Sequence, residues 1–256
     1  MERWQNKVAV VSGASAGIGA ACTRALLSAG MVVIGLARRQ ERVEQLREGL
    51  RAQEQNRLHA IRCDVKDEEQ VSETFEWIRR HLGGVDALVS NAGIIAPGEL
   101  SGRDDSAAMR STVETNIMGT VNCVREAFNS MRERGTEGHV VIINSVAGQQ
   151  VPNLGPMLPS LNIYPASKFA LRAMNEIYRQ EFQRHKTLVR VSLSLQTISP
   201  GMVDTDILPQ EIQGVVKQHM PMLRSADVAD AVLWTIGTPS NVQVHNITIK
   251  PQGEKF

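Results

Sequence analysis

Short apolar runs alternate with longer stretches of mixed polarity along most of the chain. Uninterrupted runs of Val, Ile, Leu and Ala are typical of strands buried on both faces of a parallel sheet. A first strand over residues 8–11 (Val-Ala-Val-Val) shows the pattern most clearly. Further strands are predicted at residues 31–37, 58–63, 85–89, 139–143, 189–197 and 242–249.

The stretches between these strands repeat apolar residues every three or four positions, which is typical of helices with one buried face. One begins after Asp67, a capping residue, and carries Val71, Phe75, Ile78 and Leu82 on one side. Other helices are predicted after the first strand up to residue 29, at 41–53, along a stripe from 113 to 131, at 164–184, and after residue 225. Strands that alternate with helices predict an α/β domain.

Composition narrows the class of protein. The 256 residues include 28 basic and 27 acidic side chains and no charged tail, so nothing indicates binding to nucleic acid or to an anionic membrane. Cys22, Cys63 and Cys123 are widely separated, and the histidines show no metal-type spacing, so we expect no metal site and no disulfide framework. Without a signal-peptide core or a membrane-length apolar run, we expect a cytoplasmic protein with one domain over residues 1–256.

A glycine-rich turn follows the first strand and opens a helix, with Gly13, Gly17 and Gly19 in the segment from 12 to 19. This arrangement points backbone N–H groups and a helix N-terminus at a phosphate. The segment lacks the Gly-Lys-Ser/Thr ending of a nucleoside triphosphate loop, so ATP and GTP are disfavoured. The alternative is a glycine turn that binds no ligand.

The second strand ends in Arg38 and Arg39, where dinucleotide-binding folds often carry an acidic residue for the adenosine ribose. Two guanidinium groups at this place favour a 2′-phosphate, and therefore NADP(H) over NAD(H). The alternative is that both arginines are the solvated start of the next helix.

Polar residues stand at the carboxyl ends of several predicted strands, among them Asp64, Asn91 and Ser145. Ligands of open α/β sheets bind outside these ends. We therefore expect the glycine turn and these three side chains to lie around one cleft.

Tyr164 and Lys168 are one helical turn apart, so both lie on one face of a helix. An ammonium group beside a phenol lowers the phenol pKa, and a shift from about 10 towards 7 corresponds to about 4 kcal/mol. Pro165 is tolerated only in a first helical turn, which places Tyr164 at a helix start that faces the cleft. The alternative is a tyrosine that simply packs on a lysine stem.

Two further features each allow two interpretations. Asn116 is a poor helix former in the middle of a helix, and it either bends the helix or holds an amide for a proton relay. Residues 206–223 are rich in methionine and other apolar residues, and they either adapt to an apolar ligand or pack as ordinary structure.

With Gly13, Gly17 and Gly19, the run Asn91-Ala92-Gly93, Asn116, Ser145, and the Tyr164/Lys168 pair in this order, the chain resembles a short-chain dehydrogenase/reductase from residue 7 to about residue 249. The resemblance implies a doubly wound Rossmann-type sheet of seven parallel strands and NAD(P)(H)-dependent carbonyl–alcohol chemistry. It also implies a homodimer or homotetramer.

The same resemblance implies the roles of individual residues. Tyr164 would be the general acid/base, Lys168 would lower its pKa and hold the nicotinamide ribose, Ser145 would orient the substrate oxygen, and Asn116 would keep a water in the relay. The residues expected around the cofactor are Gly13, Ser15, Gly17, Ile18, Gly19, Arg38, Arg39, Asp64, Val65, Asn91, Ala92, Gly93, Tyr164, Lys168, Pro200, Gly201, Val203 and Thr205.

The chain also departs from the family pattern. Ser145 and Tyr164 are 19 positions apart, several more than is usual, so we expect residues 146–163 to bulge at the mouth of the site. Residues 250–253 replace the acidic-glycine ending of many members. The Ala-Arg end of the second strand and the extended loop are similar to those of insect farnesol dehydrogenases and of related vertebrate reductases of keto-steroids and other carbonyls.

The leading hypothesis is therefore an NADP(H)-dependent oxidoreductase for an apolar alcohol or carbonyl, such as farnesol or a steroid, with a substrate-loop segment at about 202–223. A broad-specificity carbonyl reductase is the alternative enzyme. A dinucleotide-binding sensor without catalysis is the hypothesis from another class, and the presence of all four catalytic residue types argues against it.

Overall fold

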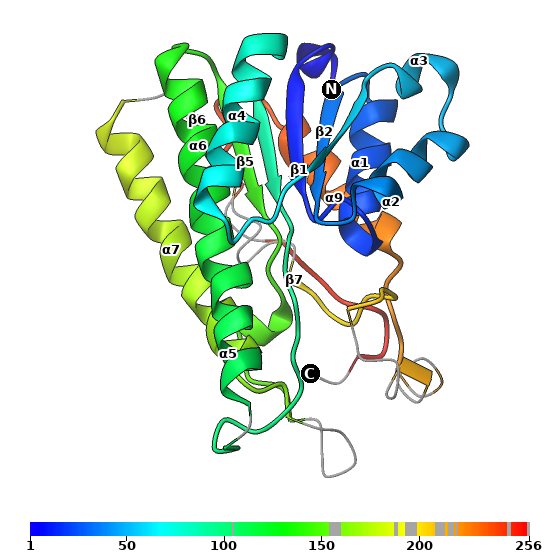
Figure 1. The fold of residues 1–256 in the computed structure, drawn as a ribbon, viewed down its shortest axis with the longest axis vertical. Helices are drawn as coiled ribbons and strands as arrows, with labels where there is room; N and C mark the ends of the chain where they lie inside the picture. The colour runs from blue at the N-terminus through cyan, green and yellow to red at the C-terminus, as the bar shows by residue number, and fades with distance from the viewer. Residues whose placement is uncertain are drawn as a thin grey trace.

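The computed structural model describes residues 1–103, 105–153, 160–186, 189–192, 199–207, 213–214, 218, 220–244 and 247–254. A parallel sheet of six strands runs through their centre in the order β3-β2-β1-β4-β5-β6 (Figure 1). The strands are β1 (Val8–Ser12), β2 (Val32–Ala37), β3 (Leu58–Arg62), β4 (Ala87–Ser90), β5 (Gly138–Ile142) and β6 (Val189–Ser192). The strand order reverses direction between β1 and β4, which is where doubly wound sheets bind ligands.

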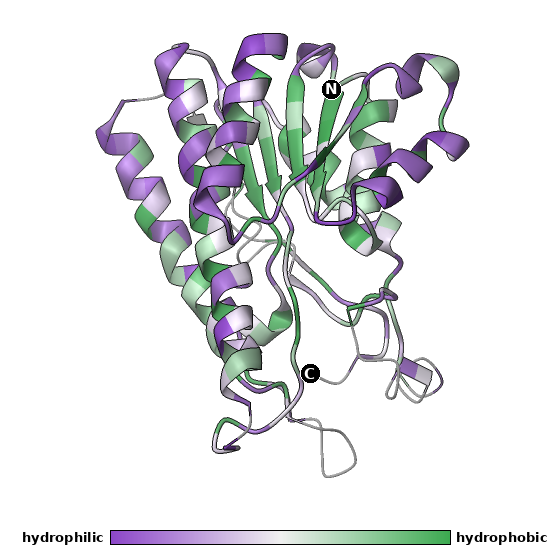
Figure 2. Ribbon diagram, in the orientation of Figure 1, coloured by the Kyte–Doolittle hydropathy of each residue, from purple (hydrophilic) through white to green (hydrophobic). Residues whose placement is uncertain are grey.

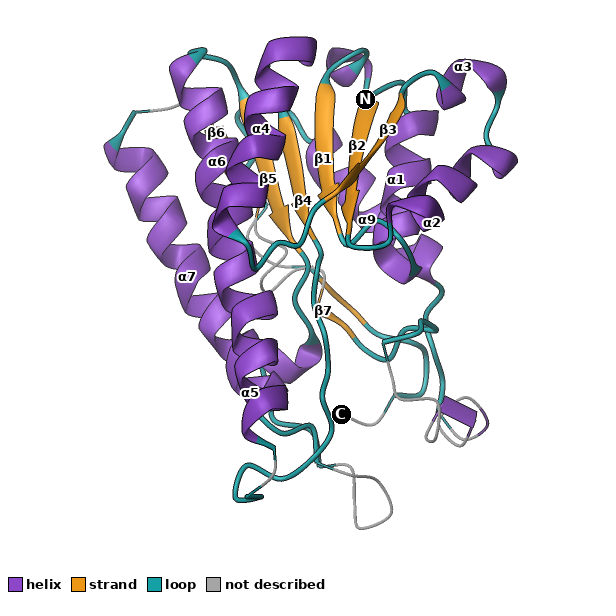
Figure 3. Ribbon diagram, in the orientation of Figure 1, coloured by secondary structure: helices purple, strands orange, loops and turns teal. Residues whose placement is uncertain are grey.

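Helices cover both faces of the sheet (Figures 1 and 3). On one face, α4 (Glu68–Leu82), α6 (Gly119–Glu133) and α7 (Tyr164–Arg184) pack on strand residues such as Val10 and Ile34. On the other face, α1 (Gly17–Ser28) and α9 (Ser225–Gly237) pack on residues such as Val11 and Val33. Adjacent strand residues thus enter opposite cores, which explains why the strands are continuously apolar (Figure 2).

Shorter elements connect this framework. They are η1 (Glu2–Trp4), α2 (Gln40–Glu44), η2 (Gln45–Gly49), α3 (Ala52–Gln55), α5 (Ser106–Val113), the π-helical turn η3 (Glu114–Met118) and η4 (Val146–Gly148). The doubly wound α/β fold predicted from the sequence is confirmed. None of the helices in the described part of the chain is long and apolar enough to cross a membrane.

The sheet itself differs from the prediction of seven strands. Residues 199–200 and 248–249 form a separate parallel pair, β7 (Ser199–Pro200) and β8 (Thr248–Ile249), beyond the carboxyl end of the main sheet. The predicted strand 189–197 is described only as far as residue 192, because residues 193–198 lie outside the described part. Pro200 has no N–H to donate, so it cannot extend a ladder in the middle of a sheet.

Two predicted helices also differ in detail. The helix expected at 41–53 is interrupted, because Leu50 is extended (ψ 151°) between η2 and α3. The stripe expected from 113 to 131 is shifted in its first half. There the buried positions are Thr112, Asn116 and Thr120 rather than Val113, Ile117 and Val121, because the π turn changes which side chains face the core.

Polar groups at the amino ends of the strands are closely paired. Asp86 is buried, its Oδ2 accepts from the Val8 N–H (2.8 Å), and its Oδ1 accepts from Arg134 Nη2 (2.9 Å). The Trp4 indole N–H donates to the Ile236 carbonyl (2.8 Å), which ties η1 to α9. These contacts fix the end of the sheet that carries no predicted site.

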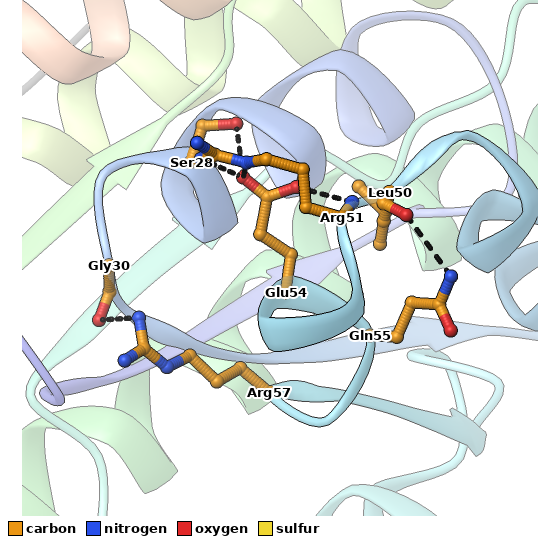
Figure 4. Close-up of polar contacts among 7 residues, drawn as sticks. All are labelled: Ser28, Gly30, Leu50, Arg51, Glu54, Gln55 and Arg57. Atoms are coloured by element: carbon orange, nitrogen blue, oxygen red, sulfur yellow. Dashed lines mark hydrogen bonds and ion pairs between the residues drawn. The ribbon is translucent and has the colours of Figure 1, made fainter.

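A second polar cluster surrounds Glu54 in α3, as Figure 4 shows. Ser28 Oγ donates to Glu54 Oε1 (3.0 Å), and Arg51 donates both its backbone N–H to Oε2 (2.9 Å) and its Nε–H to Oε1 (2.9 Å). The hydrogen bonds from Arg51 and Ser28 lower the pKa of this buried carboxyl to about 2. The cluster attaches the end of α1 to α3, the short helix that immediately precedes β3.

Candidate active site

The glycine turn joins β1 to α1 in a conformation that only glycine adopts without strain. Gly13 and Gly17 have positive φ angles of 70° and 52°. A Cβ on Gly19 would lie 2.2 Å from the Gly13 carbonyl oxygen, so the helix can begin this close to the turn only with glycine there. The turn therefore brings backbone N–H groups and the N-terminus of α1 to the carboxyl end of the sheet.

Ser12 locks this turn to the end of β4. Its Oγ accepts from the backbone N–H groups of Asn91 (3.0 Å) and Ala92 (3.1 Å). The Asn91 side chain donates back to the carbonyls of Ser12 (3.0 Å) and Gly13 (3.3 Å). The ends of β1 and β4, which flank the switch point, are thereby held in one geometry.

A cavity of about 360 Å³ lies against the glycine turn. Its basic side chains are Arg38 and Arg39, which follow β2 and are exposed. The predicted cofactor residues that line it are Gly13, Ser15, Gly17, Ile18, Arg38, Arg39, Asp64, Val65, Asn91, Ala92, Gly93 and Thr205. Gly19 lies beneath the turn instead, where it makes room for the backbone.

A second cavity of about 150 Å³ continues from the first and shares Ile18, Asn91, Gly93, Ile95, Thr205 and Ile207 with it. Ser145, Tyr164, Lys168, Pro200, Gly201 and Val203 all line it. Most of its remaining lining is apolar, including Val146, Pro152, Leu161 and Met202. The structure thus brings three of the predicted catalytic residues, Ser145, Tyr164 and Lys168, together in a smaller, mainly apolar cavity that adjoins the larger one.

Tyr164 is the first residue of α7, with Pro165 in its first turn, as the sequence predicted. Its side chain is buried, and it forms a hydrogen bond with the Ser145 side chain. Lys168 is also buried, its Nζ donates to the Ile143 carbonyl (3.0 Å), and Nζ lies 5.6 Å from the centre of the Tyr164 ring.

The pKa values of this pair differ from the expectation of a phenol near 7. Burial raises the pKa of Tyr164 to about 12, against a smaller lowering effect of the Ser145 hydrogen bond. Burial also lowers the pKa of Lys168 to about 8. The loss of water around the buried pair raises the pKa of the phenol, and this effect outweighs the attraction between the two charged forms on which the prediction rested. In this geometry Tyr164 is a protonated acid at neutral pH.

Asn116 lies behind the site rather than in either cavity lining. Its Oδ1 accepts from the Ile94 N–H (2.9 Å), and its Nδ2 donates to the Ile94 carbonyl (3.1 Å) and to Ser167 Oγ (3.0 Å). Ser167 in turn donates to the Tyr164 carbonyl (2.7 Å). The amide therefore connects the 91–94 segment to the helix that carries Tyr164, from a π turn of the kind often found at functional sites.

The long approach to Tyr164 begins with η4 after Ser145. Gln149 Nε2 donates to Ser199 Oγ (3.0 Å) and to Thr248 Oγ1 (3.0 Å), which fixes η4 to β7 and β8. Farther along the chain, Leu161 pairs with Gly98 in an isolated parallel β-bridge. Residues 154–159 of the predicted bulge lie outside the described part, as do 208–212, 215–217 and 219 of the predicted substrate segment. Met202 and Ile207 of that segment line the apolar cavity.

Glu254 is a cavity residue that the sequence argument missed. It lies 90 positions after Tyr164, and no spacing or local motif connects the two. Gln149 was missed for the same reason, because its partners come from two distant strands. Within the described residues, no group of three or more His, Cys, Asp or Glu side chains could hold a metal ion.

Comparisons with known proteins agree with this geometry. The family model described as short chain dehydrogenase matches residues 7–214. The chain is 48% identical over 256 residues to a farnesol dehydrogenase of Aedes aegypti, and the match covers 100% of both chains. It is 36% identical to the mouse dehydrogenase/reductase SDR family member 11, over 98% of this chain and 96% of that protein. The closed form of serine dehydrogenase in complex with NADP+ superimposes with a TM-score of 0.83 at 26% identity, over 97% of this chain and 96% of the other.

Proposed function

We propose that this chain, which belongs to the short-chain dehydrogenase family, transfers a hydride between NADP(H) and an apolar alcohol or carbonyl. The leading substrate is an isoprenoid alcohol such as farnesol. The observation that carries the proposal is the junction of the two cavities. Tyr164 and Ser145 line a mainly apolar cavity that shares six lining residues with the cavity suited to a dinucleotide.

The first cavity suits a dinucleotide in its backbone geometry and in its charge. The positive φ angles of Gly13 and Gly17 leave backbone N–H groups and the start of α1 free of side-chain bulk, which suits a pyrophosphate. At the far end Arg38 and Arg39 offer guanidinium groups to a 2′-phosphate, and this favours NADP(H) over NAD(H). Asp64 and Val65 would contact the adenine. When bound, the nicotinamide supplies or accepts the hydride.

The proton chemistry belongs to Tyr164. As a protonated phenol at neutral pH, it can give its proton to a carbonyl oxygen that becomes an alcohol. Ser145 can donate a hydrogen bond to the same oxygen and hold it in line. A Lys168 ammonium group nearby stabilises the phenolate that the transfer leaves behind. Asn116 acts through position, since its amide joins the 91–94 segment to α7.

The apolar cavity supports the substrate class. Side chains such as Pro152, Leu161 and Ile207 can remove a hydrocarbon chain from water, which contributes about 0.8 kcal/mol for each buried CH₂. The full-length similarity to a farnesol dehydrogenase supports an isoprenoid alcohol over a steroid. We place this enzyme in the cytoplasm and expect it to act as a homodimer or homotetramer.

A broad-specificity carbonyl reductase is the second candidate, and the similarity to an SDR family member 11 favours it over a non-catalytic sensor. The absorbance of NADPH distinguishes the three functions when the protein is mixed with farnesal, a keto-steroid and simple aldehydes, and with farnesol and NADP+ in the reverse direction. Selective turnover of the isoprenoid pair supports the proposal. Equal turnover of all carbonyls supports the second candidate, and tight NADPH binding with no turnover supports the sensor.

A further inference from the structure

The segment after β8 folds back over the apolar cavity. The Gly201 N–H donates to the Ile249 carbonyl (2.9 Å), and the Glu254 N–H closes a turn on the Pro251 carbonyl (3.2 Å). Gly253 in this turn has a φ of +90°. The turn directs the Glu254 side chain at Gly201, where an added Cβ would lie 1.8 Å from Glu254 Oε2. Glycine at position 201 therefore leaves the room that this carboxylate occupies.

The Glu254 carboxylate is buried but only partly satisfied. Its side chain is 1% exposed, and Oε2 accepts from the Met202 N–H (3.1 Å). Oε1 has no hydrogen-bond partner in the described structure, and its ion-pair partner Lys250 lies 3.6 Å away with a side chain that is 34% exposed. A buried acceptor without a hydrogen bond costs free energy. A ligand that donates a hydrogen bond to Glu254 removes this cost, and a ligand with a negative charge at the same place is repelled.

Glu254 and Lys168 are the charged side chains among the described residues that line the apolar cavity. Lys168 attracts anions, and Glu254 repels them. Charges act strongly here because little water separates them from a bound molecule. The balance between these two side chains, with Lys250 partly neutralising Glu254 from outside, determines whether a negatively charged substrate can enter.

From this geometry we infer that Glu254 is a specificity-determining residue, which makes the cavity select neutral alcohols and carbonyls and reject carboxylates of the same length. The inference rests on the proposed function, because it concerns the substrate cavity of that reaction. It gives an apolar-substrate enzyme a means to exclude fatty acids and oxo acids, which resemble its substrates in shape.

A matched pair of substrates tests the inference. Methyl 10-oxodecanoate and 10-oxodecanoate share one aldehyde and one chain and differ by a charge at pH 7.5. The measured quantity is the ratio of kcat/KM for the ester to that for the acid, followed by NADPH absorbance. In Glu254→Gln the amide oxygen still accepts from the Met202 N–H while the charge is removed, so the ratio should fall roughly tenfold. Because the ratio compares two substrates of one variant, a change in the overall rate of that variant does not affect it.

Two further variants make the result decisive. Glu48→Gln removes an exposed carboxylate in η2, outside both cavity linings, and should leave the ratio unchanged. Lys250→Met removes the partial neutralisation of Glu254 and should raise the ratio several-fold. The inference is overturned if Glu254→Gln retains activity with the ester and an unchanged ratio. Should Glu254→Gln fail to fold, an unchanged ratio in Lys250→Met overturns it.

A binding measurement separates this inference from the proposed function. A ligand that binds the cavity raises Tm. Decanamide should shift Tm equally in the wild-type protein and in Glu254→Gln, whereas decanoate should shift Tm more in Glu254→Gln. If the wild-type protein reduced no carbonyl but Glu254→Gln gained decanoate binding, the proposed function would fail and the charge selectivity would stand. If decanoate shifted Tm equally in both proteins, the charge selectivity would fail.

Discussion

Glu54 and Glu254 are both buried glutamates, yet the protein treats their carboxylates in opposite ways. Glu54 receives hydrogen bonds from Ser28 and from two groups of Arg51, and this network closes the α1–β3 connection (Figure 4). Glu254 receives one hydrogen bond from a backbone N–H and leaves Oε1 without a hydrogen bond. The hydrogen bonds of the Glu54 carboxylate stabilise the fold, whereas the Glu254 carboxylate keeps an oxygen that can still accept a hydrogen bond beside the apolar cavity.

The same contrast extends to the two ends of the sheet. At the amino ends, Asp86 pairs with Arg134 and with the backbone of β1. At the carboxyl ends, burial shifts the pKa values of Tyr164 and Lys168 away from their usual values, and each has few partners. Satisfied polar groups stabilise the fold, and incompletely satisfied ones perform chemistry at some cost in stability. Changes at the carboxyl end should therefore alter rates, and changes at the amino end should alter stability.

The largest effect is expected for Tyr164→Phe. This variant loses the proton donor while it keeps the ring, so kcat should fall by about 10³-fold, within the usual range for general acid–base catalysis. Its Tm and NADPH affinity should stay close to the wild-type values. Steady-state kinetics, fluorescence titration with NADPH and thermal unfolding together test this expectation. Activity above one tenth of wild type would assign the proton transfer to another group.

The pH dependence should differ between the two directions of reaction. Because burial raises the pKa of Tyr164 to about 12, the phenol is protonated at neutral pH, as reduction requires. Oxidation requires the deprotonated form, whose fraction rises about tenfold per pH unit below the pKa. The kcat/KM for alcohol oxidation should therefore increase as the pH rises from 7 towards about 8, the pKa at which the Lys168 ammonium loses its proton, while that for carbonyl reduction should not. Equal profiles in both directions would contradict the assignment of Tyr164 as the titrating group.

Arg38→Ala should weaken NADPH binding roughly tenfold and leave NADH binding nearly unchanged. The reason is that the exposed Arg38 guanidinium would pair with the 2′-phosphate of NADPH, and NADH has no such phosphate. Arg42→Ala is a matched control, since Arg42 is also exposed and basic but does not line the cavity. Dissociation constants for the two cofactors decide the result. An equal loss for both cofactors would remove the 2′-phosphate assignment.

The smallest effect on rate and the clearest effect on stability are expected for Glu54→Ala. Loss of the bonds from Ser28 and Arg51 should lower the free energy of unfolding by about 1–2 kcal/mol, as for the loss of a helix cap, with kcat/KM unchanged. The pKa of Glu54 is lowered to about 2, below its unfolded value near 4.5. Its contribution is therefore present above pH 4.5 and is lost as the pH falls towards 2. Urea unfolding at pH 7 and pH 3 should show a smaller difference between variant and wild type at pH 3.

The exposed Glu48→Ala provides the control for this pair of measurements. It should leave the unfolding midpoint unchanged at both pH values. If Glu54→Ala lowered activity as strongly as stability, the separation between the two regions would be wrong.

The predictions from sequence succeeded where local chemistry decides the structure. Runs such as Val8 to Val11 are strands because both faces of the sheet are covered, and Pro165 alone was enough to place Tyr164 at a helix start. The glycine turn and the cavity residues could be predicted because strand ends meet at one edge of the sheet.

The failures arose where distant parts of the chain meet. The pKa of Tyr164 depends on burial beneath several elements, and Glu254 reaches the cavity only because the chain returns past β7. The strand count differed because residues 199–200 and 248–249 pair with each other and not with the main sheet. None of these outcomes has a signature within a short window of sequence.

The π turn at residues 114–118 constrains the number of residues in this helix. The turn holds one residue more than an α-helical turn, so α5 and α6 keep their buried faces on either side of it. A one-residue deletion within the turn would let a regular α-helix run from α5 into α6 in nearly the same orientation, but it would remove the wide turn from which the Asn116 amide reaches Ile94 and Ser167. An insertion or deletion elsewhere in this helix would rotate one part relative to the other by about 100° per residue. The segment should accept many substitutions of side chain and few insertions or deletions.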